Sequence, residues 1–238
     1  MLKLSLEDII NQDLEEFKNC PKFHNCEDCE KPICVMIVAI ADFPTKNGHF
    51  KIVGFVNNKD REEHIAIIKG DIINKEGILT RVHSACLTGD ALGSLRCDCG
   101  PQLSHSLTMI EKEKLGVILY MQQEGRGIGL LNKLRAYALQ DNGYDTYDAN
   151  VALGFGPDQR DYEVAGEMLS KLGVKNIRLL TNNPEKIKQL ETYIKILERI
   201  PIELPVTEYS LDYMETKKLR FGHYLSEHMR KKIHKKMI

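Results

Sequence analysis

The sequence predicts a mixed α/β (α+β) protein, with a first half rich in β-strands and a second half containing βα units. Two observations support this fold class. Between residues 35 and 87, apolar runs follow one another with only turn material between them. From residue 116 onward, apolar runs alternate with segments of helical periodicity. Strands followed by such alternation are typical of a mixed domain. A length of 238 residues allows one large domain or two small ones.

The first expected element is an amphipathic helix over residues 4–17, where Leu, Ile and Phe recur at near-helical spacing. Four strands should follow, with the sequences 35-VMIVAIA, 50-FKIVGFV, 64-HIAIIKGDI and 78-ILTRVHSACL. Turn residues such as 45-TKNG and 57-NNKD separate them.

In the second half, a helical pattern after Gly100-Pro101 covers residues 103–110. A strand over 116–121 then precedes a Gly-rich turn and a helix over 130–140. A helix over 162–173 precedes a strand over 176–181, another helix begins near Pro184, and the last strand covers 194–202. The basic run at 230–236 is interpreted as a solvated or frayed helix end, with contact to an anionic partner as the alternative.

Composition excludes several classes of protein. Hydrophobic residues make up 42% and charged residues 28% of the chain, which excludes collagen, coiled coils and wholesale disorder. No apolar run approaches the roughly 18 residues of a membrane helix, and residues 1–11 contain no secretory signal. The net charge of −1 argues against bulk binding of nucleic acid. We therefore expect a cytoplasmic protein without membrane or nucleic-acid partners.

The unusual feature is the presence of seven cysteines, an odd number that disfavours a disulfide framework. Three of them, Cys86, Cys97 and Cys99, form a C-x10-C-x-C pattern. On an extended segment Cys97 and Cys99 would point to the same face, and turns at 89–94 could fold Cys86 back towards them. Three thiolates suit zinc and leave one position open, as in catalytic zinc sites. The alternative is that they are small buried apolar residues.

Two Gly-containing segments could handle phosphate, although the chain lacks a P-loop sequence. The segment 124-EGRGIG lies between an expected strand and helix, where backbone N–H groups and Arg126 could bind an anion. Leu130 stands where the dinucleotide fingerprint requires its third Gly, and a tight turn without a ligand is the alternative. The second segment, 154-GFGPDQR, places a carboxylate and a guanidinium two residues apart; on its own it is interpreted as a turn into the following helix, with Asp158 as its cap.

Taken together, four stretches resemble GTP cyclohydrolase II, a family of riboflavin biosynthesis. They are 81-RVHSACLTGDALGSLRCDCGPQL, 120-YMQQEGRGIGLLNKLRAYALQDNGYDT, 154-GFGPDQRDY and 179-LLTNNPEKI. The resemblance extends from about Ile37 to about Leu225, with the motifs in one order. It implies a single catalytic domain over residues 36–225, after an N-terminal helix and Cys-rich extension (1–35) and before a basic tail (226–238).

The resemblance also implies roles for residues. Cys86, Cys97 and Cys99 match the zinc ligands. Asp158 matches a proton acceptor, Arg160 a proposed nucleophile, and Tyr137 an active-site tyrosine. Positions that match GTP-binding residues are Arg81, Val82, His83, Ser84, Ala85, Gln102, Glu124, Gly125, Arg126, Thr146, Thr181 and Lys186. The cations among these positions, together with Arg160, are expected to converge on one triphosphate.

Similar enzymes are homodimers that need Zn²⁺ and Mg²⁺. They hydrolyse GTP to 2,5-diamino-6-ribosylamino-4(3H)-pyrimidinone 5′-phosphate, formate and pyrophosphate. A guanidinium stays protonated at neutral pH, so a nucleophilic Arg160 would need a base such as Asp158; otherwise it only stabilises charge while water attacks. From the length we expect no additional dihydroxybutanone-phosphate synthase domain.

The sequence departs from the family pattern at a few positions. Ala85 stands where many members carry Glu, Gln159 replaces a common acidic residue, and Met121-Gln122 precede the Gly-rich turn where some members are more basic. These departures remove no named catalytic group. They leave open a paralogue that stops at the formamidopyrimidine intermediate.

The remaining cysteines, Cys20, Cys26, Cys29 and Cys34, lie outside the resemblance. They could close a second, structural zinc site; unmetallated thiols and a redox pair are the alternatives. A rival function is a zinc-dependent nucleic-acid-binding protein that uses these cysteines and the basic tail on a non-catalytic core. The near-neutral charge and the presence of Asp158, Arg160 and Tyr137 weigh against it.

Overall fold

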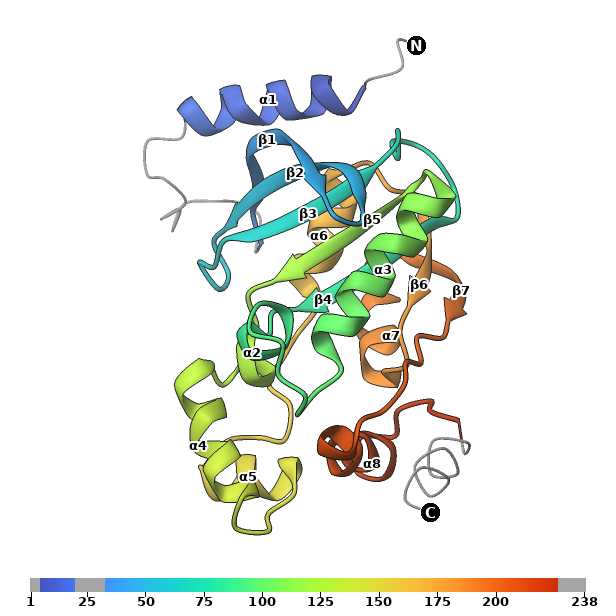
Figure 1. The fold of residues 1–238 in the computed structure, drawn as a ribbon. Coiled ribbons are helices and arrows are strands. Elements are labelled where there is room, and N and C mark those ends of the chain that lie inside the picture. The colour runs from blue at the N-terminus through green and yellow to red at the C-terminus, as the bar shows by residue number, and fades with distance from the viewer. Residues whose placement is uncertain (1–4, 20–32, 227–238) are drawn as a thin grey trace.

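A seven-stranded mixed sheet forms the centre of the protein in a computed structural model that describes residues 5–19 and 33–226 (Figure 1). The strand order is β1-β2-β3-β5-β4-β6-β7. The strands are β1 (Val35–Thr45), β2 (Gly48–Asn57), β3 (His64–Lys69), β4 (Ile78–Ser84), β5 (Gly116–Met121), β6 (Asn176–Leu180) and β7 (Lys195–Ile200).

The sheet has an antiparallel part and a parallel part. β1, β2, β3 and β5 pair antiparallel in that order, whereas β4 pairs parallel with β5 and β6, and β6 pairs parallel with β7. The carboxyl ends of β4, β5 and β6 therefore lie at the same edge of the sheet. In open α/β sheets such an edge is the usual place for a ligand.

Helices cover both faces of the sheet and extend beyond its edge. The α-helices are α1 (Leu6–Asn19), α2 (Leu87–Asp90), α3 (Cys99–Glu113), α4 (Leu130–Gln140), α5 (Thr146–Ala152), α6 (Glu163–Lys171), α7 (Pro184–Leu190) and α8 (Leu211–Leu219). Short 3₁₀ turns lie at Glu124–Gly127 (η1) and Glu208–Ser210 (η2). Apolar residues of α1, α6 and α7 share one core cluster with the sheet, and α3 packs into a second cluster. α4, α5 and α8 lie together below the carboxyl ends of the parallel strands in Figure 1.

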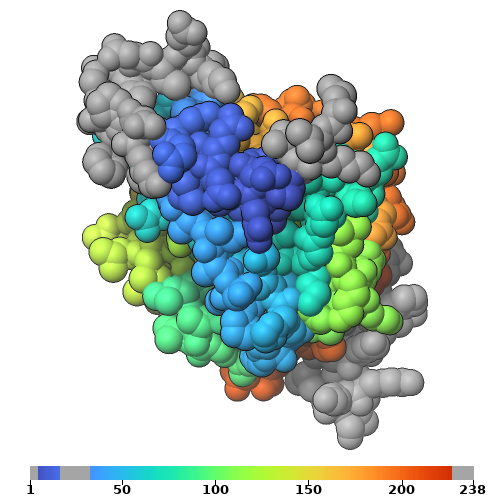
Figure 2. Space-filling view, turned by 90° about the horizontal axis from the view of Figure 1, so that it is seen from above, coloured from blue at the N-terminus to red at the C-terminus, as the bar shows by residue number. Residues whose placement is uncertain are grey.

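A buried carboxylate attaches the first helix to the domain. Asp13 of α1 is 2% exposed, accepts a hydrogen bond from the backbone N–H of Ile37 at 3.1 Å, and pairs with Lys171 Nζ at 2.6 Å. α1 thus contacts both β1 and α6, and Figure 2 shows it lying against the β1–β2 hairpin. None of the helices in residues 5–19 and 33–226 is long and apolar enough to cross a membrane.

The predicted fold class is confirmed, because antiparallel strands are followed by βα units in one sheet. The predicted helix at 4–17, the strands and the helices at 103–110, 130–140, 162–173 and near Pro184 are present within a few residues. Some local predictions are wrong. The strands expected over 64–72 and 78–87 end at Lys69 and Ser84, and Cys97 and Cys99 do not share an extended segment, since Cys99 begins α3. The helices α2, α5 and α8 were not anticipated.

Candidate active site

Three thiols meet beyond the carboxyl end of β4. Cys86 directly precedes α2, Cys97 lies in the following loop, and Cys99 is the first residue of α3. Their sulfur atoms all lie within 4.8 Å of one another, and Cys86 Sγ is 3.7 Å from Cys97 Sγ. The connection between β4 and α3 therefore folds the C-x10-C-x-C pattern into one cluster.

Two glycines make this cluster as compact as it is. A Cβ atom on Gly89 would lie 2.7 Å from Cys97 Sγ and 3.1 Å from Cys86 Sγ. A Cβ atom on Gly100 would lie 2.2 Å from the carbonyl oxygen of Gly89. Real Cβ atoms do not approach other atoms so closely, so α2 can pack on the sulfurs and on α3 only because both positions are glycine.

The ionisation of the three thiols is coupled. Hydrogen bonds from Cys97, Cys99 and Lys133 hold the pKa of Cys86 well below the ordinary thiol value. The hydrogen bond to Cys86 raises the pKa of Cys97 to about 11, and Cys86 and Cys97 raise that of Cys99. One thiolate forms readily, but three would repel one another. A divalent cation removes that repulsion, so three crowded soft donors fit zinc.

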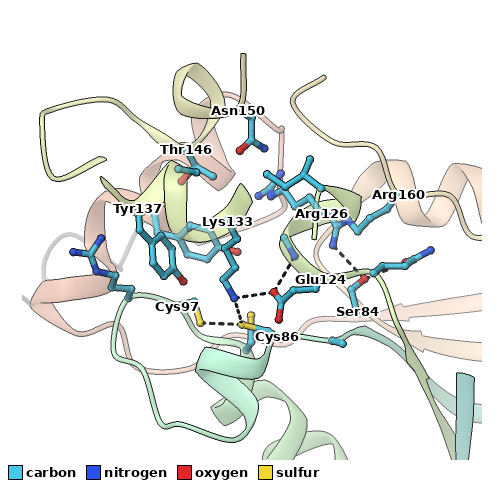
Figure 3. Close-up of a pocket in the computed structure, with 18 of the residues that line it drawn as sticks. Ser84, Cys86, Cys97, Glu124, Arg126, Lys133, Tyr137, Thr146, Asn150 and Arg160 are labelled. Carbon is cyan, nitrogen blue, oxygen red and sulfur yellow. Dashed lines mark hydrogen bonds and ion pairs between the residues drawn. The ribbon is translucent and has the colours of Figure 1, made fainter. Parts of the chain in front are cut away.

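Lys133 of α4 joins the thiol cluster to the Gly-rich turn (Figure 3). Its ammonium donates to Cys86 Sγ at 3.1 Å, Thr88 Oγ1 at 2.8 Å and Glu124 Oε1 at 2.8 Å. Tyr137 lies one helical turn further along, with its hydroxyl 3.3 Å from Thr88 Oγ1. Burial raises the pKa of Tyr137, so its hydroxyl keeps its proton at neutral pH.

The buried carboxylate of Asp90 is hydrogen-bonded to the backbone of Cys86. Asp90 Oδ2 accepts hydrogen bonds from the backbone N–H of Cys86 at 3.0 Å and from the Tyr120 hydroxyl at 2.9 Å. His83 Nε2 lies 3.1 Å from both carboxylate oxygens of Asp90. Burial, the largest cause, lowers the pKa of His83, which favours a neutral ring that donates to Asp90. This network fixes the backbone at Cys86.

The Gly-rich turn is strained at a charged residue. Gly125 and Arg126 both have left-handed backbone angles, with φ of 63° and 62°. A positive φ is unusual for a side chain as long as arginine, and such strain is often found at functional sites. The Arg126 guanidinium lies 3.8 Å from the ring centre of Phe221. Arg126 Nη1 is buried and makes no hydrogen bond within the described residues; Asp158 Oδ2 is 3.6 Å away, which is an ion-pair distance only.

A second cavity beside the first is rich in cations. It is lined by Arg81 from β4, Arg126 from η1, Arg160, and Lys186 from α7. Lys186 is 4% exposed; burial and repulsion by Arg81 and Arg160 lower its pKa well below the ordinary value. Arg81 Nε has no hydrogen-bond partner in the part of the chain that is described. The cavity thus offers buried donors to an anion.

Arg160 is held by Asp158 two residues earlier. Asp158 Oδ1 accepts from Arg160 Nε at 2.9 Å, and Oδ2 accepts from Nη2 at 2.5 Å. Burial by itself would lower the pKa of Arg160, but Tyr162 and Asp158 outweigh it and raise the pKa. The guanidinium is therefore charged at neutral pH. Asp158 is not the cap of α6, whose N-cap residue is Tyr162.

Most of the predicted site residues line one or both cavities. The first cavity contains Ser84, Ala85, Cys86, Cys97, Cys99, Glu124, Gly125, Arg126, Tyr137, Thr146 and Arg160. The second contains Arg81, His83, Ser84, Cys99, Gln102, Arg126, Arg160, Thr181 and Lys186. Val82 and Asp158 line neither. The backbone oxygen of Val82 accepts from Lys186 Nζ at 2.6 Å, and Asp158 lies behind Arg160.

Several cavity residues were not predicted, namely Lys133, Asn150, Tyr213, Lys217 and His223. Lys133 precedes Tyr137 by four residues on the predicted helix and so shares its face, which is a signal that the sequence carries. No motif pointed to the last three. Of the N-terminal cysteines, Cys20, Cys26 and Cys29 lie outside the described residues, as do residues 227–238 of the basic tail. Cys34 is half-buried, and its backbone N–H donates to Asn58 Oδ1.

Fold and site together define a mixed α/β protein in which a thiol cluster suited to a metal opens onto a cavity suited to a polyphosphate. We compared the sequence with models of known protein families. The model of the family described as GTP cyclohydrolase II matches residues 36–201. The chain belongs to the GTP cyclohydrolase II family.

Curated relatives are similar over most of the chain. Riboflavin biosynthesis proteins RibBA of Bacillus cytotoxicus and Bacillus cereus are each 54% identical over 184 residues, covering 77% of this chain and 46% of the relative. The chain thus spans about half the length of these relatives. Among solved structures, RibBX from A. baumannii, a two-domain 3,4-dihydroxy-2-butanone 4-phosphate synthase, matches with a TM-score of 0.41 and 19% identity, over 71% of this chain and 40% of that one.

Proposed function

We propose that this chain is a zinc-dependent GTP cyclohydrolase II of riboflavin biosynthesis. It would convert GTP into 2,5-diamino-6-ribosylamino-4(3H)-pyrimidinone 5′-phosphate, formate and pyrophosphate. The observation that carries the proposal is the contact between two chemically different cavities, which share Ser84, Cys99, Arg126, Arg160 and Tyr213. One cavity suits hydrolysis of a purine ring and the other suits a triphosphate.

Cys86, Cys97 and Cys99 would hold the zinc ion. A zinc ion held there would supply the Lewis-acid chemistry needed for hydrolytic opening of the guanine ring at C8. The chain's own residues orient this site. Lys133 binds Cys86 Sγ and Glu124, and Asp90 fixes the backbone N–H of Cys86.

Release of formate requires a proton for the departing amine. Tyr137 would donate it, because its hydroxyl is protonated at neutral pH and lies beside Thr88 near the thiols. Thr88 also accepts from Lys133, so the three side chains form one hydrogen-bonded path at the wall of the first cavity. A positioned acid of this kind typically contributes 10²- to 10⁴-fold to a rate.

Release of pyrophosphate is assigned to the second cavity. Arg81, Arg126, Arg160 and Lys186 would stabilise the phosphoryl oxygens, together with Mg²⁺ brought by the nucleotide. The nucleophile role that the family resemblance implies for Arg160 requires Asp158 to deprotonate a guanidinium whose pKa is raised. Stabilisation of charge requires no deprotonation, and the Asp158–Arg160 pairing favours that role.

The proposed catalytic domain comprises residues 36–225, because cavity residues continue past the family match to Tyr213, Lys217 and Leu225. We also propose that the chain acts as a cytoplasmic homodimer, as similar enzymes do. Analytical ultracentrifugation of the full chain would test the dimer: a monomer at assay concentration would contradict it.

Incubation of the purified chain with GTP, Mg²⁺ and Zn²⁺ tests the function. We expect the absorbance of guanine to be replaced by that of a pyrimidine, with one formate and one pyrophosphate released per GTP. Pyrophosphate without formate would indicate the formamidopyrimidine-forming paralogue instead. No turnover with zinc bound would contradict both enzymatic functions.

The role of Arg160 has a separate test. If Arg160 stabilises charge, Arg160→Lys should retain measurable pyrophosphate release, because the cation is kept. Isolation of a nucleotidyl adduct on Arg160 during turnover would establish the nucleophile role instead.

A further inference from the structure

A helix without any predicted role forms one wall of the cation-rich cavity. α8 and the turn that follows it contribute Tyr213, Lys217 and His223 to the lining. These residues lie beyond residue 201, where the family match ends. Arg81, Arg126, Arg160 and Lys186, described above, line the same cavity.

Three sets of contacts, before α8, at its C-terminal end and after it, hold the helix in place beside the cavity. Arg220 pairs with Asp145 Oδ2 at 3.0 Å and with Asp148 Oδ1 at 2.9 Å, at the start of α5. Before the helix, Thr207 Oγ1 donates to the carbonyl of Leu95 at 3.2 Å. After it, the backbone N–H of Tyr224 donates to the carbonyl of Asn182 at 2.8 Å. The segment is therefore placed by contacts to the elements that carry the site.

The turn after α8 brings two side chains together. Gly222 adopts a left-handed backbone with φ of 63°, and the N–H of His223 then donates to the carbonyl of Lys217 at 3.0 Å. Leu225, 9% exposed, anchors the end of the turn. His223 and Lys217 thus line the same cavity from one short segment.

Lys217 has unused donors in this cavity. Its side chain is 9% exposed, and Nζ pairs with Asp98 Oδ1 at 2.5 Å. An ammonium has three N–H donors, and Asp98 accepts one of them within the described residues. Asp98 also accepts from Gln102 Nε2 at 2.5 Å, so it would keep a partner if Lys217 turned to a ligand.

His223 faces an excess of positive charge. Burial, followed by repulsion from Lys217, Arg126, Arg160 and Lys186, lowers its pKa to about 2. Its ring makes no hydrogen bond or ion pair in the part of the chain that is described. A neutral imidazole surrounded by four cations has an N–H donor available for an anion.

We propose that Lys217 and His223 bind the polyphosphate of the substrate, so that α8 and the turn after it add a second set of phosphate-binding groups to Arg81, Arg160 and Lys186. The inference rests on the proposed function for the identity of the nucleotide, GTP. The binding chemistry itself requires only an anion with several phosphate groups.

Calorimetric titration of the full chain with inorganic tripolyphosphate tests the inference without turnover. Lys217→Met should weaken binding about tenfold or more, the usual effect of losing a charge-assisted hydrogen bond. His223→Asn should weaken it severalfold. Lys218→Met, the same change of charge one residue along α8 and outside the cavity lining, should leave affinity within about twofold.

Guanosine, which has no phosphate, is the control ligand, and its affinity should be the same in all variants. Equal tripolyphosphate affinity in the wild type and either cavity variant would overturn the inference for that residue. Parallel loss of guanosine binding would also overturn it, because it would indicate general damage to the site. His223→Asn leaves the Asp98–Lys217 pair intact, which keeps the test valid if Lys217→Met does not fold.

The inference and the proposed function can fail separately. Lys217-dependent binding of tripolyphosphate without conversion of GTP would reject the ring-opening function and keep phosphate binding by Lys217. Normal formate release, with tripolyphosphate affinity unchanged in both cavity variants, would support the ring-opening function and reject phosphate binding by Lys217 and His223.

Discussion

The Nζ atom of Lys133 lies 3.1 Å from the Sγ atom of Cys86, so a buried cation contacts a ligand of the candidate zinc site. Three thiolates and one Zn²⁺ carry a net charge of −1, which is costly to bury without a partner. Lys133, 9% exposed, would place a positive charge against Cys86 Sγ of such a site, and it also pairs with Glu124 of the Gly-rich turn. The thiol cluster and the Gly-rich turn are thereby connected through one side chain.

We expect Lys133→Met to reduce zinc affinity by about tenfold or more, the typical effect of removing a partner of a metal ligand. Competition with a chromophoric chelator would measure it. Arg135→Met, on the exposed side of the same helix, is the matched control and should bind zinc as the wild type does. Unchanged zinc affinity in Lys133→Met would contradict the charge-compensation role.

Gly89→Ala should abolish stoichiometric zinc binding while the protein stays folded. The added methyl group would lie 2.7 Å from Cys97 Sγ, which forces the sulfurs apart. Metal content by atomic spectrometry and circular dichroism would report the two properties. Gly54→Ala, where a Cβ atom has its nearest neighbour at 3.5 Å, is the control. A Gly89→Ala protein with one zinc per chain would show that the packing is less restrictive than the distances indicate.

Tyr137→Phe should slow formate release by about 10²-fold or more, because the variant cannot donate a proton to the leaving amine. Pyrophosphate release, which is assigned to the other cavity, should be affected much less. Both products can be followed in one assay. Tyr144→Phe, at a 46% exposed tyrosine, should behave as the wild type. Equal slowing of both products would count against a specific role of Tyr137 in deformylation.

We expect the free energy of unfolding to decrease at acid pH when Asp60, in the β2–β3 connection, becomes protonated. Burial alone would raise the pKa of Asp60, but hydrogen bonds from His64, from the N–H of Glu62 and from Asn57 outweigh it and lower the pKa to about 2. A carboxyl whose pKa is lower in the folded protein stabilises it above its unfolded value near 3.8, and that stabilisation is lost as the pH falls towards 2.

Asp60→Asn should therefore unfold more easily than the wild type at pH 6, with the difference shrinking between pH 4 and 2. Denaturant unfolding at a series of pH values measures it. Asp42→Asn, at an 82% exposed side chain, is the control. A difference that stays constant down to pH 2 would contradict the depressed pKa of Asp60.

The elements with strong periodicity could be predicted from the sequence, and those set by tertiary contacts could not. The strand at 116–121 is a continuous apolar run that begins at Gly116, and the helix at 130–140 has a helical period and follows Gly129, so both are predicted to the residue. The C-x10-C-x-C spacing indicated a thiol cluster, but the path between the thiols depends on the close packing of Gly89 and Gly100, which no periodicity encodes. α8 is short and polar, and it buries Lys217 only because Asp98 lies opposite.

The position of β4 inside the sheet protects its backbone amides from exchange with solvent. β4 is hydrogen-bonded to β5 on one side and β6 on the other, whereas β1 and β7 are edge strands. Fraying in a sheet begins at its edges, where each strand has one neighbour, and the innermost backbone amides exchange with solvent last. Amide protons of β4, which leads into Cys86, should thus be among the most slowly exchanging in the chain. Transient opening of the β1–β2 hairpin would leave the thiol cluster and the cation-rich cavity assembled.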